Sequence, residues 1–388
     1  MKPLRRFCVL TVPFLVLIAI SFSPAGAAGR PSLATPAISP AGNQIAFVSG
    51  GKIWTVNAAG GPARILIADG ATDDRPLYSP DGGRLAFIST HSGYANVYVF
   101  TLATGSLARL TYDDTNEQLD GWSRDGWIYF STSSHNVEGR SDIDRVRESG
   151  GTPLPIITQT YVDQFYAAPS PDGRSIAFNL RGLSGSQWWR NGHSHIDDSQ
   201  IWIRRGTGAH PTYEQLTDGS AKEIWPMWAP DGARVYYMSD RTGNENIWER
   251  ALGESARQVT HFTSGRVLWP TISANGQTIA FERDFGVWKL DTRSGRAQRV
   301  SVDLQGVLSE NDRTHVTRTD QYNDFRVSPD GKKLAFIVHG RLFAVGASGG
   351  PAFAVTRAGK NVRELTWSPD SDAIAFASGS GHEDRIFT

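Results

Sequence analysis

The chain has 388 residues and a formal net charge of zero, because 39 lysines and arginines balance 39 aspartates and glutamates. Bulk electrostatics therefore favours neither nucleic acid nor an anionic membrane surface as a partner. The single cysteine, Cys8, lies in the N-terminal apolar run, so the chain after it offers no disulfide, thiolate metal site or cysteine nucleophile.

The first 28 residues have the pattern of an export signal. A basic start precedes an apolar run from Phe7 to Ile20, and Ala25-Gly26-Ala27 places small residues where a signal peptidase cleaves. We predict a signal peptide over residues 1–28, cleaved near Ala27, and a periplasmic or secreted location. A membrane anchor is the alternative, but the run is short for a bilayer span, and we expect no stable membrane insertion after cleavage.

Eight copies of one turn signal follow, each just before a strand-like apolar run. They read SPAGNQIAF from Ser39, SPDGGRLAF from Ser79, SRDGWIYF from Ser123, SPDGRSIAF from Ser170, APDGARVYY from Ala229, SANGQTIAF from Ser273, SPDGKKLAF from Ser328 and SPDSDAIAF from Ser368. Pro presets the backbone for a turn, Asp or Asn bonds back to its own main chain, and Gly accepts a positive φ. Each signal therefore predicts a hairpin that leads into a buried second strand.

Further strand patterns complete each repeat. A third strand is predicted in GKIWTV from Gly51, ANVYVF from Ala95, SQIWIRR from Ser199, ENIWER from Glu245, FGVWKL from Phe285 and GRLFAV from Gly340. A fourth strand ends in a form such as RLT, QLT or QVT. Four short antiparallel strands at a blade-sized spacing, with no amphipathic helix between them, predict an all-β fold of β-propeller blades.

The spacing of the signals predicts two groups of blades. The interval from Ser273 to Ser328 contains a polar run over residues 309–321, which is typical of a linker. We expect a six-bladed propeller over residues 29–308, a linker over 309–323, and the first two blades of a second propeller over 324–388. The last unit stops before a fourth strand, which favours a truncated sequence. The alternative is one eight-bladed ring whose last blade is completed by residues 30–38.

Two recurring features are best interpreted as structural rather than as parts of a binding site. Tryptophans recur at one position of the third strand, which is typical of core between blades; they are Trp54, Trp202, Trp248 and Trp288. The pairs Asp73-Asp74 and Asp113-Asp114 lie between repeats, where paired acids are typical of solvated turns.

The repeats resemble a known group of propellers. WSPDS from Trp367, SPDGKKLAF from Ser328, SDRTGNENIW from Ser239 to Trp248, and QLT from Gln215 to Thr217 are similar to TolB-like and tricorn-type repeats, which are WD-like. The arrangement narrows the resemblance. A tricorn-type protease begins with a six-bladed propeller, continues into a seven-bladed one, and then carries a PDZ domain and a serine protease core. TolB places an α/β domain before its propeller, and no such domain fits between residue 28 and Ser39.

The resemblance implies a non-catalytic propeller region of an exported tricorn-like serine protease. Such a region would gate or bind peptide substrates for a protease core that has no counterpart in these residues. No catalytic residue is carried over, and the chain has no HExxH, Walker or GxGxxG motif, so we expect no enzyme activity and no cofactor from this chain alone. The alternative is a free-standing TolB-like periplasmic propeller that scaffolds protein–protein interactions. The expected partners are peptides or proteins, and the oligomeric state stays open.

An insertion in the fourth repeat, LSGSQWWRNGHSHIDDSQIW from Leu183, supplies the candidate site residues. If its latter half is extended, His193, His195 and Asp197 share one face and could hold a divalent metal ion. A peptide or partner site, built on stacking and on a carboxylate clamp, would use Trp188, Trp189, Arg190, His193 and His195. The structural alternative is an ordered loop whose tryptophans pack on the propeller and whose polar side chains make local hydrogen bonds.

Overall fold

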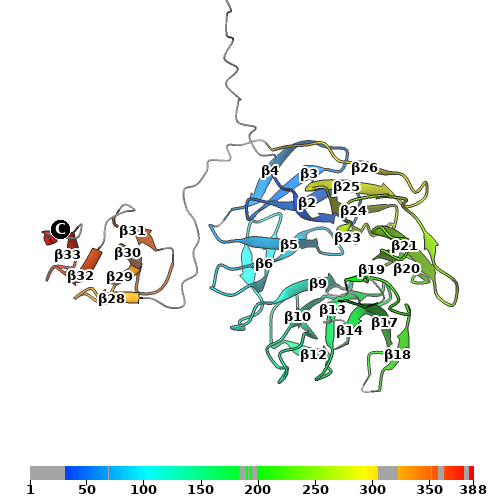
Figure 1. Ribbon diagram of the computed structural model, residues 1–388, viewed down its shortest axis with the longest axis horizontal. Helices are drawn as coiled ribbons and strands as arrows, with labels where there is room; N and C mark the ends of the chain where they lie inside the picture. The colour runs from blue at the N-terminus through cyan, green and yellow to red at the C-terminus, as the bar shows by residue number, and fades with distance from the viewer. Residues whose placement is uncertain are drawn as a thin grey trace, which may run out of the picture. The chain divides into compact units, whose positions relative to one another are not determined.

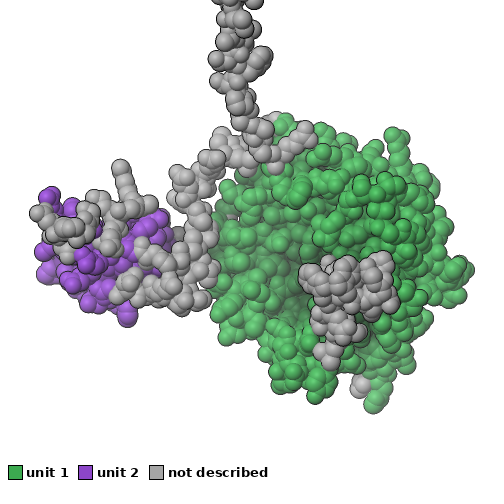
Figure 2. Space-filling view, viewed as in Figure 1, with its two compact units in different colours: residues 1–308 green, residues 309–388 purple. Residues whose placement is uncertain are grey.

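The computed structural model describes residues 31–304 and 322–388, except residues 69, 183–188, 191–192, 195–198, 209, 339, 351, 357–361 and 380–383. Two compact units divide the chain at residue 308, and each is described by itself (Figure 2). Every regular element in the described residues is a β-strand, which confirms the predicted all-β fold. No helix among these residues is long and apolar enough to cross a membrane.

The first unit contains six sheets of four or five strands that radiate from a common centre (Figure 1), and all their strand pairs are antiparallel except the pair of β27 with β4. Sheet 1 has β1 (Ala34–Ile38), β2 (Gln44–Ser49), β3 (Lys52–Asn57), β4 (Gly61–Ile67) and β27 (Val302–Leu304). Sheet 2 has β5 (Asp73–Tyr78), β6 (Arg84–Ser89), β7 (Asn96–Thr101) and β8 (Leu107–Arg109). Sheet 3 has β9 (Gln118–Trp122), β10 (Trp127–Thr132), β11 (Asp142–Arg147) and β12 (Leu154–Ile157).

The other three sheets of this unit follow the same strand order. Sheet 4 has β13 (Asp163–Pro169), β14 (Ser175–Arg181), β17 (Gln200–Arg205) and β18 (Thr212–Gln215), with the two-stranded pair β15 (Trp189–Arg190) and β16 (His193–Ser194) inserted after β14. Sheet 5 has β19 (Glu223–Trp228), β20 (Arg234–Ser239), β21 (Asn246–Ala251) and β22 (Arg257–Gln258). Sheet 6 has β23 (Leu268–Ile272), β24 (Thr278–Arg283), β25 (Gly286–Asp291) and β26 (Ala297–Arg299).

Each turn signal joins the first and second strands of a sheet through local hydrogen bonds. The Ser79 hydroxyl accepts from the Arg84 amide (2.9 Å) and donates to Asp81, whose carboxylate also accepts from the Gly83 amide (3.0 Å). Gly82 has φ +75°, a conformation that glycine adopts without strain. The bond from Ser79 also holds the pKa of Asp81 below its ordinary value. The signal is therefore a self-contained turn, which explains why it marks every blade.

The second strands form the core, as predicted. Ile45, Phe47, Leu85 and Phe87 are fully buried, and the aromatic residue of each second strand faces one on the third strand in most sheets. These cross-strand pairs include Phe47 with Trp54, Phe87 with Tyr98, Phe178 with Trp202, Tyr237 with Trp248, and Phe281 with Trp288. Trp54 and Trp248 are buried, and the half-buried Trp202 and Trp288 pack against core clusters, so the tryptophan positions are core positions.

The threonine of the LT and VT endings ties the fourth strand to the third. The hydroxyl of Thr217 accepts from the Ile201 amide (2.9 Å), and that of Thr260 accepts from the Ile247 amide (2.9 Å). Both hydroxyls are buried, where a backbone N–H without a partner would be destabilising. This role explains why the ending recurs in the sequence.

The six first strands close a ring. In succession, β1, β5, β9, β13, β19 and β23 contact one another, and β23 contacts β1. The Ile38 amide donates to Thr271 Oγ1 (3.0 Å) across this closure, and β27 pairs in parallel with β4. Because β1 pairs with β2 inside sheet 1, residues 34–38 belong to the first blade, and the alternative in which they complete an eighth blade is wrong.

The second unit contains two sheets with a small common core. One sheet has β28 (Tyr322–Val327), β29 (Lys333–Val338), β30 (Arg341–Gly346) and β31 (Phe353–Ala354), and the other has β32 (Val362–Trp367), β33 (Ile374–Gly379) and β34 (Asp384–Phe387). The core contains Ala335, Ile337, Leu342, Val362 and Leu365.

Candidate functional site

A cavity of about 230 Å³ lies where the first strands of all six sheets of the first unit meet. Its mouth is formed by the second residue of each of the first six turn signals: Pro40, Pro80, Arg124, Pro171, Pro230 and Ala274. We call this cavity the funnel. The repeated turn that builds each hairpin thus also shapes the entrance to the centre of the ring.

β-bulges in the first strands carry residues with an unusual backbone conformation near the centre of the ring. Five first strands shift register at equivalent positions. A residue other than glycine has a φ between 43° and 59° at each of these bulges: Thr35, Arg75, Tyr166, Trp225 and Trp269. Such backbone is rare for these residue types and is typical of functional or tightly packed positions.

Four of these side chains, each from a different sheet, meet at the floor of the funnel, which Arg75, Tyr166 and Trp225 line. The rings of Trp225 and Trp269 lie 5.3 Å apart between centroids, and Tyr166 lies 5.7 Å from each of them. The Arg75 guanidinium lies over the Trp269 ring, 4.9 Å from its centroid. Cation–π and edge-to-face contacts therefore hold this cluster together.

Two opposite charges are buried at this floor. Arg75 is 7% exposed and Asp120, on β9, is 8% exposed. Arg75 Nε donates to the Leu119 carbonyl (3.3 Å), and the Ser131 hydroxyl donates to Asp120. Burial lowers the pKa of Arg75. Burial also raises the pKa of Asp120 to about 7, against the opposing effects of the Ser131 bond, nearby backbone amides and the Arg75 charge.

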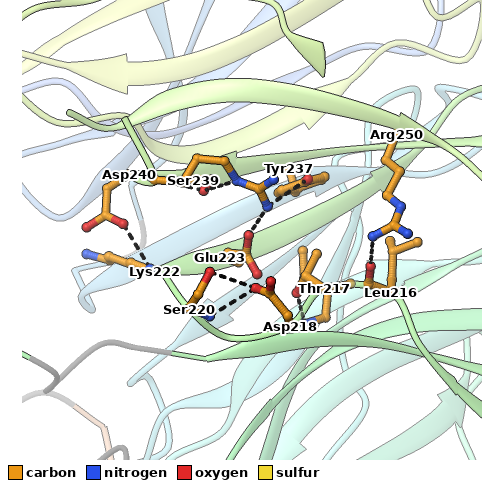
Figure 3. Close-up of polar contacts among 12 residues, drawn as sticks. Leu216, Thr217, Asp218, Ser220, Lys222, Glu223, Tyr237, Ser239, Asp240 and Arg250 are labelled. Carbon is orange, nitrogen blue, oxygen red and sulfur yellow. Dashed lines mark hydrogen bonds and ion pairs between the residues drawn. The ribbon is translucent and has the colours of Figure 1, made fainter. Parts of the chain in front are cut away.

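A second polar cluster lies at the start of β19. Figure 3 shows Glu223 among polar contacts that join residues 216–223 to residues 237–250. Glu223 is fully buried, and one of its oxygens accepts from Arg241, which also donates to Ser239 Oγ (3.2 Å) and Tyr237 Oη (3.3 Å). Burial raises the pKa of Glu223. Because Arg241 also lies over the Trp248 ring, we interpret this cluster as structural.

The residues predicted from the fourth-repeat insertion lie largely outside the described part of the chain. Trp188, His195 and Asp197 are not described; Trp189 and Arg190 pair through their backbone with Ser194 and His193, and their side chains are not described either. The metal and partner-binding roles therefore stay predictions. In the described residues, no group of three or more His, Cys, Asp or Glu side chains is placed to hold a metal ion.

One sequence interpretation is wrong. Asp73 was expected in a solvated turn, but it is the first residue of β5 and only 1% exposed. The first strands lack the clear alternation of the second strands, so the sequence pattern did not place Asp73 in a strand.

The floor residues were not predicted, although a sequence signal marks them. Arg75, Tyr166, Trp225 and Trp269 each lie four residues before a turn signal, and Thr35 does the same in sheet 1. In four of the five cases a proline follows directly: Pro36, Pro76, Pro226 and Pro270. A proline that interrupts a strand is typical of a bulge or an edge, so the X-Pro pair points to the bulge.

Comparisons with known proteins agree with this architecture. Residues 31–296 match the model of the tricorn protease N-terminal β-propeller domain, and the chain belongs to this family. Tricorn protease homolog 1 of Streptomyces coelicolor is 23% identical over 367 residues, covering 88% of this chain and 33% of that protein. The predicted tricorn-type resemblance is therefore confirmed.

Two further matches are a solved structure with a similar fold and a second group of sequence relatives. The crystal structure of the tricorn protease covers 92% of this chain with a TM-score of 0.55 at 19% identity, and 34% of that chain is covered. The Tol-Pal system protein TolB of Francisella tularensis is 28% identical over 218 residues, covering 54% of this chain and 46% of TolB. The chain spans about a third of the length of the tricorn relative from Streptomyces.

Proposed function

We propose that this chain is the non-catalytic propeller region of an exported tricorn-like serine protease and that its funnel binds peptides for a protease core outside these residues. The observation that carries the proposal is the funnel itself, where first strands from five of the six sheets place aromatic and charged side chains at one floor. Clefts that combine apolar walls with a few convergent polar groups are typical binding sites. Under this proposal residues 29–308 form the first propeller, 309–323 a linker, and 324–388 the first blades of a second propeller.

Peptide binding by the purified chain tests this proposal. Ala274 is exposed at the funnel mouth, so Ala274→Trp should block entry without disturbing the core. We expect fluorescein-labelled tetra- to hexapeptides to bind in fluorescence anisotropy titrations, with affinity at least tenfold lower for Ala274→Trp. Ala59→Trp, in an exposed turn outside the funnel, serves as the control and should bind like the unmodified chain. We also expect no hydrolysis of these peptides.

Two results would contradict this proposal. Equal binding by Ala274→Trp and Ala59→Trp would place the peptides elsewhere, and loss of binding in a Trp188→Ala, Trp189→Ala double variant would assign them to the insertion instead. Peptide turnover that copurifies with the chain would contradict a non-catalytic role.

The second candidate function is a periplasmic scaffold for protein partners, favoured by the similarity to TolB over half of the chain. It predicts weak binding of all the short peptides. A folded protein partner would instead bind through exposed propeller loops, and its affinity would not change in Ala274→Trp.

Export is part of both functions and has its own test. We expect the protein expressed with its N-terminus intact in a Gram-negative host to accumulate in the periplasm. N-terminal sequencing of that material should begin at Ala28, because the small residues Ala25 and Ala27 define the cleavage site. Recovery of the intact N-terminus in the membrane fraction would support the anchor alternative.

A further inference from the structure

Three polar atoms at the funnel floor have no partner within the described residues. They are Nη1 of Arg75, Nε1 of Trp225 and Oδ1 of Asp120. These side chains are only 7%, 5% and 8% exposed, and all three line the same cavity. Buried polar groups in folded proteins nearly always have hydrogen-bond partners. Three such atoms around one cavity therefore indicate a ligand that supplies them.

The chemistry of the three atoms restricts that ligand. Arg75 and Trp225 offer donors and Asp120 offers an acceptor, while Nε of Arg75 already donates to Leu119 and Oδ2 of Asp120 already accepts from Ser131. Arg75 and Asp120 form no ion pair with each other in the described part of the chain, so Nη1 of Arg75 and Oδ1 of Asp120 are both left to be matched by a ligand. A simple carboxylate would leave Asp120 unmatched, and a simple amine would leave Arg75 unmatched. A zwitterion matches both.

The walls and the volume restrict the ligand further. Apolar side chains from different sheets line the cavity: Ile38, Leu77, Met227, Trp228 and Ile272. The volume of about 230 Å³ lies below the roughly 300–1,000 Å³ that is usual for drug-sized ligands. The site therefore suits one small molecule with an apolar group.

We propose that the funnel floor is a binding site for a free α-amino acid with an apolar side chain. The ligand carboxylate accepts from Arg75 Nη1 and Trp225 Nε1, its ammonium group donates to Asp120 Oδ1, and its side chain packs against Leu77, Met227 and Ile272. This site goes beyond the peptide-binding function, because it needs both charged ends of a single residue at the floor.

Calorimetric titration of the full chain with L-leucine, L-leucinamide and N-acetyl-L-leucine tests the site. Leucinamide lacks the carboxylate and N-acetyl-leucine lacks the ammonium group, so each should bind at least tenfold more weakly than leucine. Arg75→Gln should remove the preference for leucine over leucinamide, and Asp120→Asn should remove the preference over N-acetyl-leucine. Arg293→Gln, at an exposed turn, should preserve the full pattern.

These outcomes separate the site from a merely structural role. A damaged fold would weaken the binding of all three ligands together, whereas loss of one matching group changes the order of their affinities. If Arg75→Gln does not fold, titration of the same three ligands into the unmodified chain and into Trp225→Phe still tests the proposed site. No heat of binding with leucine at millimolar concentration, or equal binding of the three ligands, would overturn the inference and indicate that water alone fills the floor. Labelled peptides could still bind at the mouth in that case, so the proposed function would stand.

Discussion

Replacement of Arg241 by alanine is expected to lower the free energy of unfolding by about 3–5 kcal/mol at pH 8. Glu223 is fully buried, and its Oε2 has no hydrogen-bond partner among the residues that the structure describes, so the Arg241 guanidinium is the positive charge that compensates this carboxylate. Without Arg241 a buried carboxylate remains without a counter-charge. Urea unfolding followed by tryptophan fluorescence measures the change, since Trp367 is the one tryptophan outside residues 1–308.

The effect of Arg241→Ala should depend on pH in a defined direction. Burial already raises the pKa of Glu223 above its ordinary value of 4.5, and removal of the arginine raises it further. An acid with a raised pKa in the folded state destabilises that state increasingly as the pH rises above its unfolded pKa. The difference between the variant and the unmodified chain should therefore be small near pH 4.5 and should grow toward pH 8.

Arg257→Ala is the matched control for this prediction. Arg257 pairs with Glu249 at 2.7 Å, but its side chain is 65% exposed, so its loss should change stability by about 0–1 kcal/mol. Equal effects of the two substitutions at pH 8 would show that water or another group compensates Glu223 when Arg241 is absent.

The blade architecture was predictable because its signals are local. Ser79, Asp81 and Gly82 close a turn with bonds that span only a few residues, and the alternation of the second strand follows directly. There is a physical reason why the sequence did not predict β11 in sheet 3. Asp144 stands opposite Phe130 where other sheets have an aromatic residue, so the third-strand pattern is hidden by a charged residue that is nevertheless only 1% exposed.

The funnel floor could not be predicted in the same way, because its residues come from different sheets. Arg75 and Trp269 lie far apart in the sequence and meet only after the ring closes. Their backbone also has a positive φ, which propensity does not assign to arginine or tryptophan. A search for prolines three residues before a turn signal would find four of the five bulge positions, but only the closed ring shows which of the side chains converge.

Substitution of Gly121 by alanine is expected to destabilise the first unit by about 1–3 kcal/mol, although a side chain usually favours a strand over glycine. A Cβ atom at this position would lie 2.5 Å from the Ala167 carbonyl oxygen and 2.8 Å from Pro169 Cδ, both on the first strand of the next sheet. Neither atom belongs to a flexible side chain, so relief requires β9 and β13 to move apart. That movement would also shift Asp120 and Tyr166 at the funnel floor.

Gly208→Ala provides the comparison, because its Cβ would meet no atom within 4 Å and its φ is not positive. It should leave stability unchanged or raise it by about 0.4–1 kcal/mol through the unfolded state. The urea midpoint, read by tryptophan fluorescence, should therefore fall for Gly121→Ala and not for Gly208→Ala. A larger residue makes the test stricter: Gly121→Val should lower the midpoint further and weaken any ligand at the floor, because the clash displaces the strand that carries Asp120. Unchanged midpoints for both Gly121 variants would mean that adjacent blades slide past each other without loss of packing, contrary to a rigid closed ring.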